Sequence, residues 1–303
     1  MEVAVVALRW LQYSGAVVLL GAPLFLLYAF RSSDGPSLSW ARPTLILAAV
    51  FITLGSGAAL VTQTAVMAGS LSEAVKPASL SFMVTGTGLG MAMVVRMVTA
   101  TLALLAILAD KPGRGLWKLT VLAGLVVAAS FAWTGHGAAT EGPSGRLHLV
   151  ADIVHAIAAA LWLGALAALT SLLVRRTAPD DLAIHHALHG FAGVGTVAVA
   201  LLVLSGMVNS WFLVGAGRVA DLGATLYGQL LIAKLALFAL MLALAAGNRF
   251  RLTPGLGSDL ARGEDPRQAL QRLRHSVLAE ALVGCAVLGL VAVMGTLPPP
   301  SAL

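Results

Sequence analysis

The sequence predicts an all-α fold, a polytopic membrane helical bundle of about eight transmembrane helices with both chain ends on the outer side of the membrane. Three observations lead to this prediction. Hydrophobic residues make up 59% of the 303-residue chain and charged residues only 11%, whereas soluble domains contain about 25% charged residues. Apolar runs of about 20 residues, long enough to cross a bilayer as helices, recur along the chain. Short polar loops containing glycine and proline separate most of these runs.

The apolar runs define the spans in chain order. We expect them at residues 3–30, 43–67, 89–109, 116–133, 148–174, 187–214, 224–250 and 276–297. The first run has no basic stretch before it and no small-residue cleavage site, so we interpret it as a retained helix. No loop is long enough for a soluble domain. The chain is therefore expected to form a single membrane domain, residues 1–303, with four N-terminal helices (1–135), a histidine-rich loop and fifth helix (136–175) and three C-terminal helices (187–297).

Basic residues are concentrated in every second loop. The loops after the first, third, fifth and seventh spans carry Arg31, Arg42, Lys111, Arg114, Lys118, Arg175, Arg176, Arg249, Arg251, Arg262, Arg267, Arg272 and Arg274. The alternate loops carry only Lys76, Arg146 and Arg218. The positive-inside rule places the first set in the cytoplasm and both termini outside. This asymmetry explains the net charge of +6, so no nucleic-acid partner is expected.

The main candidate site lies at the start of the fifth span. His148, Asp152, His155 and Trp162 fall on one face of this helix, because an α-helix has 3.6 residues per turn. His136 precedes the span across a short loop. Ionisable groups are costly to bury in a membrane, so they indicate a functional site. We therefore predict a metal site formed by His136, His148, Asp152 and His155.

The ligand types favour copper, and several arrangements remain open. Imidazole and thioether suit copper, whereas zinc favours histidine with aspartate. Asp152 can share an ion with His148 or with His155, but those two histidines are two helical turns apart, too far for bonds near 2 Å to one ion. The helix thus predicts two sites or a relay from surface to depth, with His136 as the third ligand. Alternatively, Asp152 orients a ligating histidine, or it pairs with a buried cation.

Other residues of the spans are expected in an outer shell or along a pathway. They are Met91, Met93, Met97, Arg96, Trp162, Asn209, Lys234 and Glu280. Arg96 and Lys234 are expected to balance the charge of Asp152, because a protonated cation cannot bind a metal. The methionines can contact copper, but methionine is also a common core residue. Glu280 has three open interpretations: a pathway group, a partner for an arginine, or a proton carrier.

Several remaining features are given non-catalytic interpretations. The single cysteine, Cys285, excludes an intrachain disulfide and a cysteine-based metal cage, and it is expected to be buried. His185, His186 and His189 at the inner end are interpreted as an interfacial basic patch rather than an exit-side ion site. No glycine loop lies between a strand and a helix, and no serine nucleophile has a nearby base. We therefore do not expect an enzyme.

Two sets of motifs carry a family resemblance. The first set is Trp133-Thr-Gly-His136, His148-Leu-Val-Ala-Asp152-Ile-Val-His155 and Leu161-Trp-Leu-Gly164. The second is Leu204-Ser-Gly-Met-Val-Asn209, Tyr227-Gly-Gln-Leu-Leu-Ile-Ala-Lys234, Asn248-Arg-Phe-Arg251 and the last span with Glu280. These motifs resemble the copper resistance protein D (CopD/PcoD) family of bacterial inner-membrane proteins. The resemblance implies an eight-helix protein that handles copper, often beside the periplasmic carrier CopC. No CopC-like domain is fused here, so that partner would be a separate chain.

Residues and resemblance together predict a function in copper handling. The protein is expected to take Cu+ or Cu2+ at the periplasmic face of the inner membrane, with both termini periplasmic, and to import it to the cytoplasm. His136 and His148 would capture the ion and pass it to Asp152 and His155, and then along the helices that carry methionines. Two alternatives stay open. One is a haem-b electron carrier with His136 and His155 as axial ligands, and the other is an assembly factor that holds copper without transport.

Overall fold

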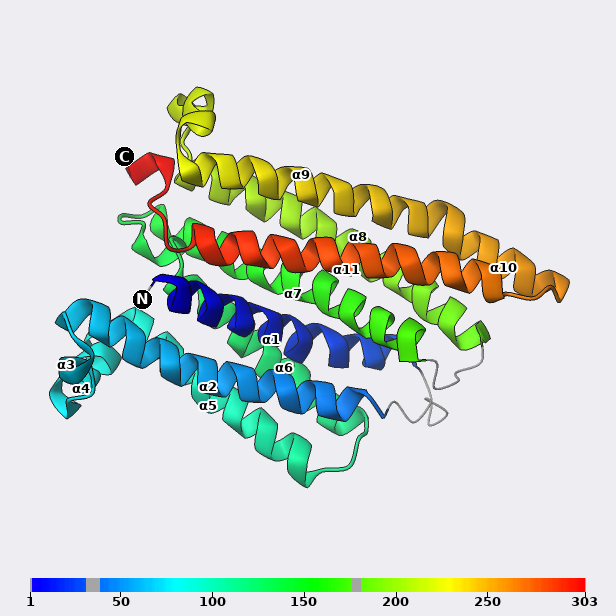
Figure 1. Ribbon diagram of the computed structural model, residues 1–303, viewed down its shortest axis with the longest axis horizontal. Coiled ribbons are helices and arrows are strands. Elements are labelled where there is room, and N and C mark those ends of the chain that lie inside the picture. Colours follow the sequence, from blue (N-terminus) through cyan, green and yellow to red (C-terminus); the bar gives the residue numbers. More distant parts are fainter. Residues whose placement is uncertain (1, 31–38, 176–180, 303) are drawn as a thin grey trace.

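The computed structural model describes residues 2–30, 39–175 and 181–302, and within these ranges the secondary structure is helical (Figure 1). Among the described residues, eight helical segments are long and apolar enough to cross a membrane. The long helices are α1 (Glu2–Ala29), α2 (Ala41–Ala68), α5 (Gly88–Ala109), α6 (Arg114–Ser130), α7 (Gly145–Arg175), α8 (Asp181–Leu213), α9 (Leu226–Gly247) and α11 (Arg267–Met294). The predicted all-α fold with eight spans is confirmed.

Shorter helices lie at the ends of the spans. They are α3 (Leu71–Ala74), α4 (Pro77–Gly86), η1 (Phe131–Thr134), η2 (Gly137–Ala139), η3 (Ala216–Ala224), the π-helical η4 (Asn248–Leu252), α10 (Thr253–Arg262) and η5 (Pro300–Ala302). Two predicted spans are too short: helix α11 begins at Arg267, and α9 continues through η4 into α10. Hydropathy detects only the part of a helix that matches the hydrocarbon layer, whereas the polar tips extend beyond it.

The two ends of the bundle differ in what they carry. Both chain termini lie at one end, together with α3, α4 and η3 (Figure 1); we call this the terminal end. The opposite end, which we call the basic end, carries the connections 110–113 and 263–266 and the tips of α7 and α10. The arrangement agrees with an even number of spans. That the basic end faces the cytoplasm stays a prediction from the positive-inside rule.

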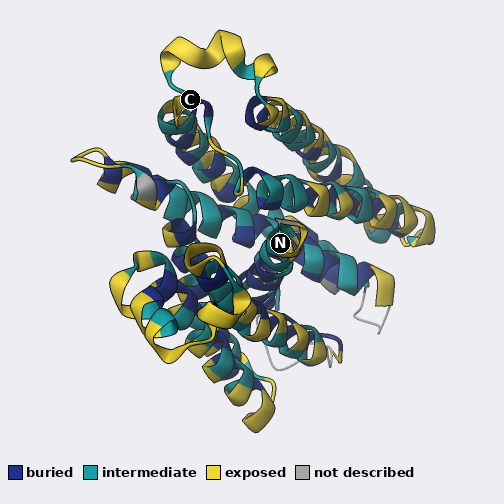
Figure 2. Cartoon of the chain, turned by 60° about the vertical axis from the view of Figure 1, so that its left-hand side comes forward, coloured by how far each residue is buried: buried dark blue, intermediate teal, exposed yellow. Residues whose placement is uncertain are grey.

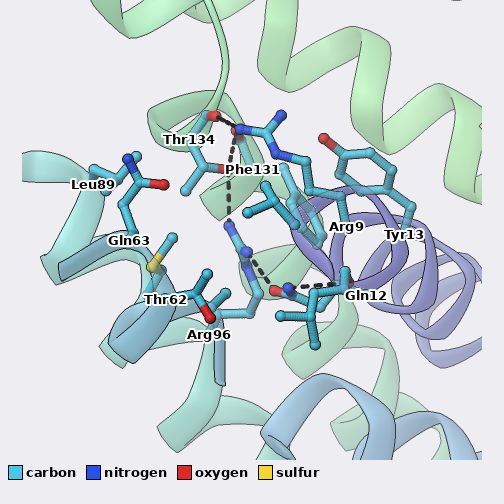
Figure 3. Close-up of a pocket in the computed structure, with 13 residues that line it drawn as sticks. Arg9, Gln12, Tyr13, Thr62, Gln63, Leu89, Arg96, Phe131 and Thr134 are labelled. Atoms are coloured by element: carbon cyan, nitrogen blue, oxygen red, sulfur yellow. Dashed lines mark hydrogen bonds between the residues drawn. The ribbon is translucent and has the colours of Figure 1, made fainter. Parts of the chain in front are cut away.

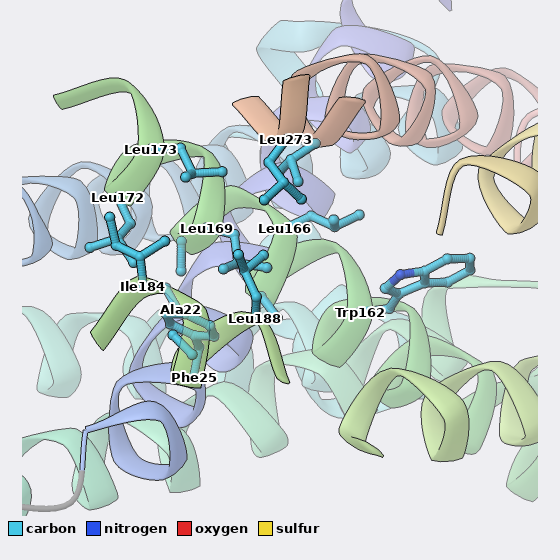
Figure 4. Packing of buried hydrophobic residues seen from close by; sticks show 14 of the residues in the cluster. Ala22, Phe25, Trp162, Leu166, Leu169, Leu172, Leu173, Ile184, Leu188 and Leu273 are labelled. Carbon is cyan, nitrogen blue, oxygen red and sulfur yellow. The ribbon is translucent and has the colours of Figure 1, made fainter. Parts of the chain in front are cut away.

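Helix α7 lies at the centre of the bundle and packs against α1, α8 and α11. Its contact with α1 depends on two small residues, because a Cβ atom on Gly21 would lie 2.6 Å from the Cα of Gly164. Small residues allow helices in a membrane to approach closely. Toward the basic end, leucines of α7 form the main apolar core with Phe25 of α1, Leu188 of α8 and Leu273 of α11 (Figure 4).

The outer surface of the bundle is apolar as well. Exposed positions occur along the spans (Figure 2), and many of them carry large hydrophobic residues, among them Leu54, Leu102, Leu204 and Trp211. Such a surface is unfavourable in water but is matched by lipid chains. The helices therefore present many large apolar residues to the bilayer as well as burying others in the core of the bundle.

Candidate metal centre

The loop that carries His136 folds back onto helix α7 at the terminal end. The backbone N–H of Gly137 donates a hydrogen bond of 3.1 Å to Oδ2 of Asp152. A Cβ atom at Gly137 would overlap the same carboxylate oxygen, and one at Gly135 would lie 3.5 Å from it. The glycines on both sides of His136 therefore allow the loop to approach Asp152 closely.

Asp152 joins this loop to a third element. Its other oxygen, Oδ1, accepts a hydrogen bond of 2.8 Å from the side-chain amide of Asn209 on α8. Both donors are neutral, so the carboxylate is not part of an ion pair. The ion pairs within the described residues involve neither Asp152 nor Lys234, although these two side chains interact electrostatically. An ionised Asp152 thus has one cation, Lys234, within electrostatic range and forms no direct ion pair with it.

His136 is partly exposed and is held in a defined orientation. Its Nε2 atom lies 3.1 Å from the carbonyl oxygen of Leu297, and its ring meets that of Tyr227 edge-on with centroids 6.0 Å apart. A carbonyl oxygen only accepts, so Nε2 carries the proton and the lone pair of the neutral ring lies on Nδ1. Burial lowers the pKa of His136, and the nearby Arg9 lowers it further, whereas the Leu297 carbonyl and Asp152 oppose this shift. At neutral pH the ring is therefore available as a metal ligand.

The other two histidines of the predicted site form separate hydrogen bonds. His148 is completely buried at 0% exposure; its Nδ1 lies 2.7 Å from Oγ1 of Thr140, and its ring stacks on Phe212. The Nε2 atom of His148 has no partner. His155 lies deeper, where its Nδ1 is 3.0 Å from Oγ of Ser205. That hydroxyl donates to the carbonyl of Leu201, so Nδ1 of His155 is the donor and its Nε2 carries the lone pair.

The structure thus brings together only part of the predicted site. His136 and Asp152 meet at the terminal end, whereas His148 and His155 lie in hydrogen bonds of their own. Among the described residues, no three histidine, cysteine, aspartate or glutamate side chains are arranged to hold a metal ion. The predicted three-ligand centre is therefore not assembled in this conformation, and a metal-binding role for these residues stays a prediction.

Arg96 does not balance the charge of Asp152, contrary to expectation. Its side chain is 2% exposed and lies in the N-terminal half of the bundle (Figure 3). The guanidinium donates to Oε1 of Gln12 at 2.8 Å, to Oγ and the carbonyl of Ser130 at 2.9 and 3.2 Å, and to Oγ1 of Thr134 at 3.3 Å. It also lies 3.6 Å above the Phe131 ring. Neutral acceptors from α1, α6 and η1 satisfy this cation.

A small cavity of about 30 Å³ adjoins Arg96. Arg9 of α1 also lines it and donates a hydrogen bond of 3.0 Å to the carbonyl of Thr134 (Figure 3). Sequence reasoning missed Arg9, because an arginine so near the chain start resembles an ordinary interfacial charge. The two guanidinium groups make this side of the terminal end positive and unfavourable for a metal cation.

The methionines near Arg96 do not line a common path. Met91 is exposed on the outer surface, Met93 is buried beside the cavity of Arg96, and Met97 packs against Gly57 of α2. The three side chains therefore point in different directions from α5. Helix α5 packs against α2, α4 and α6 and also touches η1, and the surroundings of Met93 and Met97 are the Arg96 cavity and α2 rather than the His136 loop.

Two further expectations can be compared with the structure. Cys285 is exposed on α11 rather than buried; a thiol behaves as a small apolar group, so the lipid-facing surface suits it. His185, His186 and His189 lie near one another on α8, with ring centroids 6.1 and 6.5 Å from that of His185. Their interpretation as a basic patch stays a prediction.

The fold and this surface define a multi-pass membrane protein, and comparison with known proteins identifies its family. Residues 1–146 match the family model for the copper resistance protein D-like N-terminal domain, and residues 185–294 match that for copper resistance protein D. The chain is 38% identical to "Copper resistance protein D" of Pseudomonas syringae pv. tomato, over 97% of this chain and 96% of that protein. The chain belongs to the copper resistance protein D family, as its motifs predict.

Two more distant relatives agree with this assignment. The chain is 31% identical to "Copper transport protein CutJ" of Bacillus subtilis over 61% of this chain and 31% of that protein. It is 28% identical to "Inner membrane protein YebZ" of Escherichia coli over 55% of each chain. No solved structure matches. The protein is thus a copper-related, multi-pass protein of the bacterial inner membrane.

Proposed function

We propose that this protein binds copper at the terminal end of the bundle and transports it across the inner membrane toward the cytoplasm. Copper is then the transported substrate rather than a resident cofactor. The observation that carries the proposal is the contact between the His136 loop and Asp152, which brings a neutral imidazole within electrostatic range of a carboxylate that forms no ion pair within the described residues. The names of two relatives, a copper resistance protein and a copper transport protein, support copper as the ion.

The arrangement suits an ion that must also leave. A site that conducts an ion must bind it strongly enough for entry and weakly enough for release. Nδ1 of His136 offers one nitrogen ligand, and Asp152 offers negative charge and the oxygen lone pairs that its two hydrogen bonds leave free. Two such groups bind copper more weakly than a complete cage of three or four ligands would.

His155 is the next group along α7 with a free lone pair. Its Nδ1–H is used by Ser205, so Nε2 can accept an ion that moves inward from Asp152. His148 contributes a second unpartnered nitrogen, Nε2, in the buried region above. The relay from surface to depth therefore remains the mechanism that we propose, with His136 and Asp152 as its entry. A separate periplasmic CopC-like carrier is the partner that we expect to deliver the ion.

Metal binding by purified variants tests the entry site. We expect His136→Ala and Asp152→Asn each to weaken Cu+ binding by roughly tenfold or more, the range found when metal-site groups are removed. His189→Ala is the matched control, because this histidine is exposed on α8 at the basic end. Unchanged Cu+ affinity in the double variant His136→Ala, Asp152→Asn would reject the site.

Transport is tested separately from binding. Proteoliposomes that contain the wild-type protein should accumulate copper, and His155→Ala should slow uptake while leaving the entry site able to bind Cu+. Binding without any uptake would favour the copper-holding assembly factor. A Soret band in the visible spectrum of the purified protein would favour the haem-b carrier instead.

A further inference from the structure

A second region with buried polar groups lies in the half of the bundle next to the basic end. Here a cavity of about 210 Å³ opens between α7, α8, α11 and the junction of α9 with η4. Most of its lining is apolar, including Leu166, Leu169 and Leu188, which Figure 4 labels together with Trp162. Glu280 of α11 and Asn248 of η4 also line it. A cavity of this volume has room for several water molecules.

Glu280 is buried without a counter-charge. Its side chain is 1% exposed, and its one hydrogen bond of regular geometry within the described residues comes from Nδ2 of Asn248 to Oε2, at 3.0 Å. The indole N–H of Trp162 also lies near this carboxylate, outside regular hydrogen-bond geometry. The other oxygen, Oε1, is buried and has no partner, and the same holds for Oδ1 of Asn248. None of the ion pairs of the described chain includes Glu280. Such a carboxylate is costly unless it binds a proton or a cation.

A local change in helix geometry accompanies this contact. Asn248 begins the π-helical segment η4, where the regular ladder of α9 widens. Single π-turns inside α-helices are frequent at functional sites. In this turn Asn248 contacts Glu280 on α11, whereas the next residue, Arg249, donates to the carbonyl of Ala192 at 3.2 Å and to Oγ1 of Thr196 on α8. The amide and the guanidinium are thus directed to different helices.

Among the residues that line the cavity, Glu280 is the acidic one. Helix α7 contributes Trp162 and leucines, and α8 contributes apolar residues and Thr196. The η4 segment contributes Arg249, the one cation among the lining residues, and α10 contributes Thr253. Helix α1, which also packs against α11, contributes no side chain to the cavity.

We propose that Glu280 is a proton-binding site and that the cavity, filled with water, connects it to the basic end of the bundle. A hydronium ion in the cavity gives one proton to Oε1; an O–H bond of the hydronium breaks, an O–H bond at Oε1 forms, and no electron is transferred. The protonated Oε1 then donates to a cavity water, which gives this buried oxygen the partner that it lacks. Coupling of this proton to copper movement rests on the proposed function, whereas the proton site itself does not.

Infrared spectroscopy of the copper-free protein in lipid nanodiscs tests the site. We expect the wild-type protein at neutral pH to show the C=O stretch of a protonated carboxyl group, and Glu280→Gln to lose this band. Asp152→Asn is the control with another buried carboxyl removed, and it should keep the Glu280 band. A Glu280→Gln spectrum that superimposes on that of the wild type would overturn the proposal. Because copper is absent, this result is independent of whether the protein transports copper.

Two glycines of α8 provide a test that leaves Glu280 in place. Gly195 lines the cavity, and a Cβ atom there would meet only Phe191 of the same helix, at 3.6 Å. Gly193 is exposed, and a Cβ atom there would meet nothing within 4 Å. We expect Gly195→Leu to fill the cavity and to slow hydrogen–deuterium exchange of the carboxyl band by roughly tenfold, which corresponds to a barrier higher by about 1.4 kcal/mol. Gly193→Leu should exchange like the wild type. Equal exchange rates in the two variants would contradict a water path through this cavity.

Discussion

Arg96 and Glu280 are both almost completely buried, yet their surroundings differ. Arg96 donates four hydrogen bonds to neutral acceptors on three elements, stacks on Phe131 and adjoins a cavity of only about 30 Å³. Glu280 has one hydrogen bond, an oxygen without a partner and a cavity of about 210 Å³ beside it. A buried ionisable group whose hydrogen bonds are all satisfied stabilises a structure, whereas one that lacks partners next to open space can exchange a proton or another ligand. The buried ionisable group of the N-terminal half thus suits a structural role, whereas that of the C-terminal half suits the proton binding that we propose.

The largest expected effect concerns stability. Arg96→Met should lower the free energy of unfolding by about 3–5 kcal/mol, because buried acceptors on Gln12, Ser130 and Thr134 would lose their donors. Glu280→Gln should change it by less than about 1 kcal/mol, since a glutamine oxygen can still accept from Asn248. Reversible unfolding in mixed detergent measures both values. An equal loss of unfolding free energy in the two variants would show that Glu280 contributes as much to stability as Arg96, and would contradict the difference between them.

An effect of intermediate size is expected at the loop that carries His136. In Gly137→Ala the new Cβ atom would overlap Oδ2 of Asp152, so the loop must move away at a cost of about 1–3 kcal/mol. The variant should also bind Cu+ more weakly, because His136 moves with the loop. Gly115→Ala is the matched control, since a Cβ atom there meets nothing within 4 Å and alanine favours a helix. If Gly137→Ala binds Cu+ with wild-type affinity, the position of the loop does not contribute to metal binding.

The spans could be predicted from the sequence, because each residue of a membrane-spanning helix contributes to its hydrophobicity independently of the tertiary structure. The sequence also predicted that His136 and Asp152 lie close together, but not the contacts that hold the His136 loop in place, since these are partly made by backbone groups. The N–H of Gly137 and the carbonyl of Leu297 have no signature in the sequence. Likewise, the sequence shows that Arg96 and Glu280 are ionisable residues within spans. It does not show which of the two has all its hydrogen-bond partners.

Helix periodicity also has a limit that the predicted metal site illustrates. His148, Asp152 and His155 share a face of α7, as 3.6 residues per turn requires. The neighbouring elements then divide that face: the loop before α7 supplies Thr140 to His148, and α8 supplies Ser205 to His155. Residues on one face of a helix are therefore near one another, but this alone does not make them bind the same ion.

The smallest expected effect is a shift in pH dependence that separates the terminal end from the basic end. Burial and Arg9 lower the pKa of His136 below its usual value, near 6.5 for an unperturbed histidine. The folded ring thus stays neutral as the pH falls through 6.5 and is protonated only below its lowered pKa, so Cu+ binding should be lost at a midpoint below 6.5. Arg9→Gln removes one positive neighbour and should raise this midpoint, by less than about one pH unit for a partly exposed pair. Arg249→Gln, at the basic end, should leave it unchanged. Cu+ affinity measured from pH 5 to 8 in the three proteins checks this, and an equal shift in both variants would mean that net charge, rather than the neighbourhood of His136, sets the midpoint.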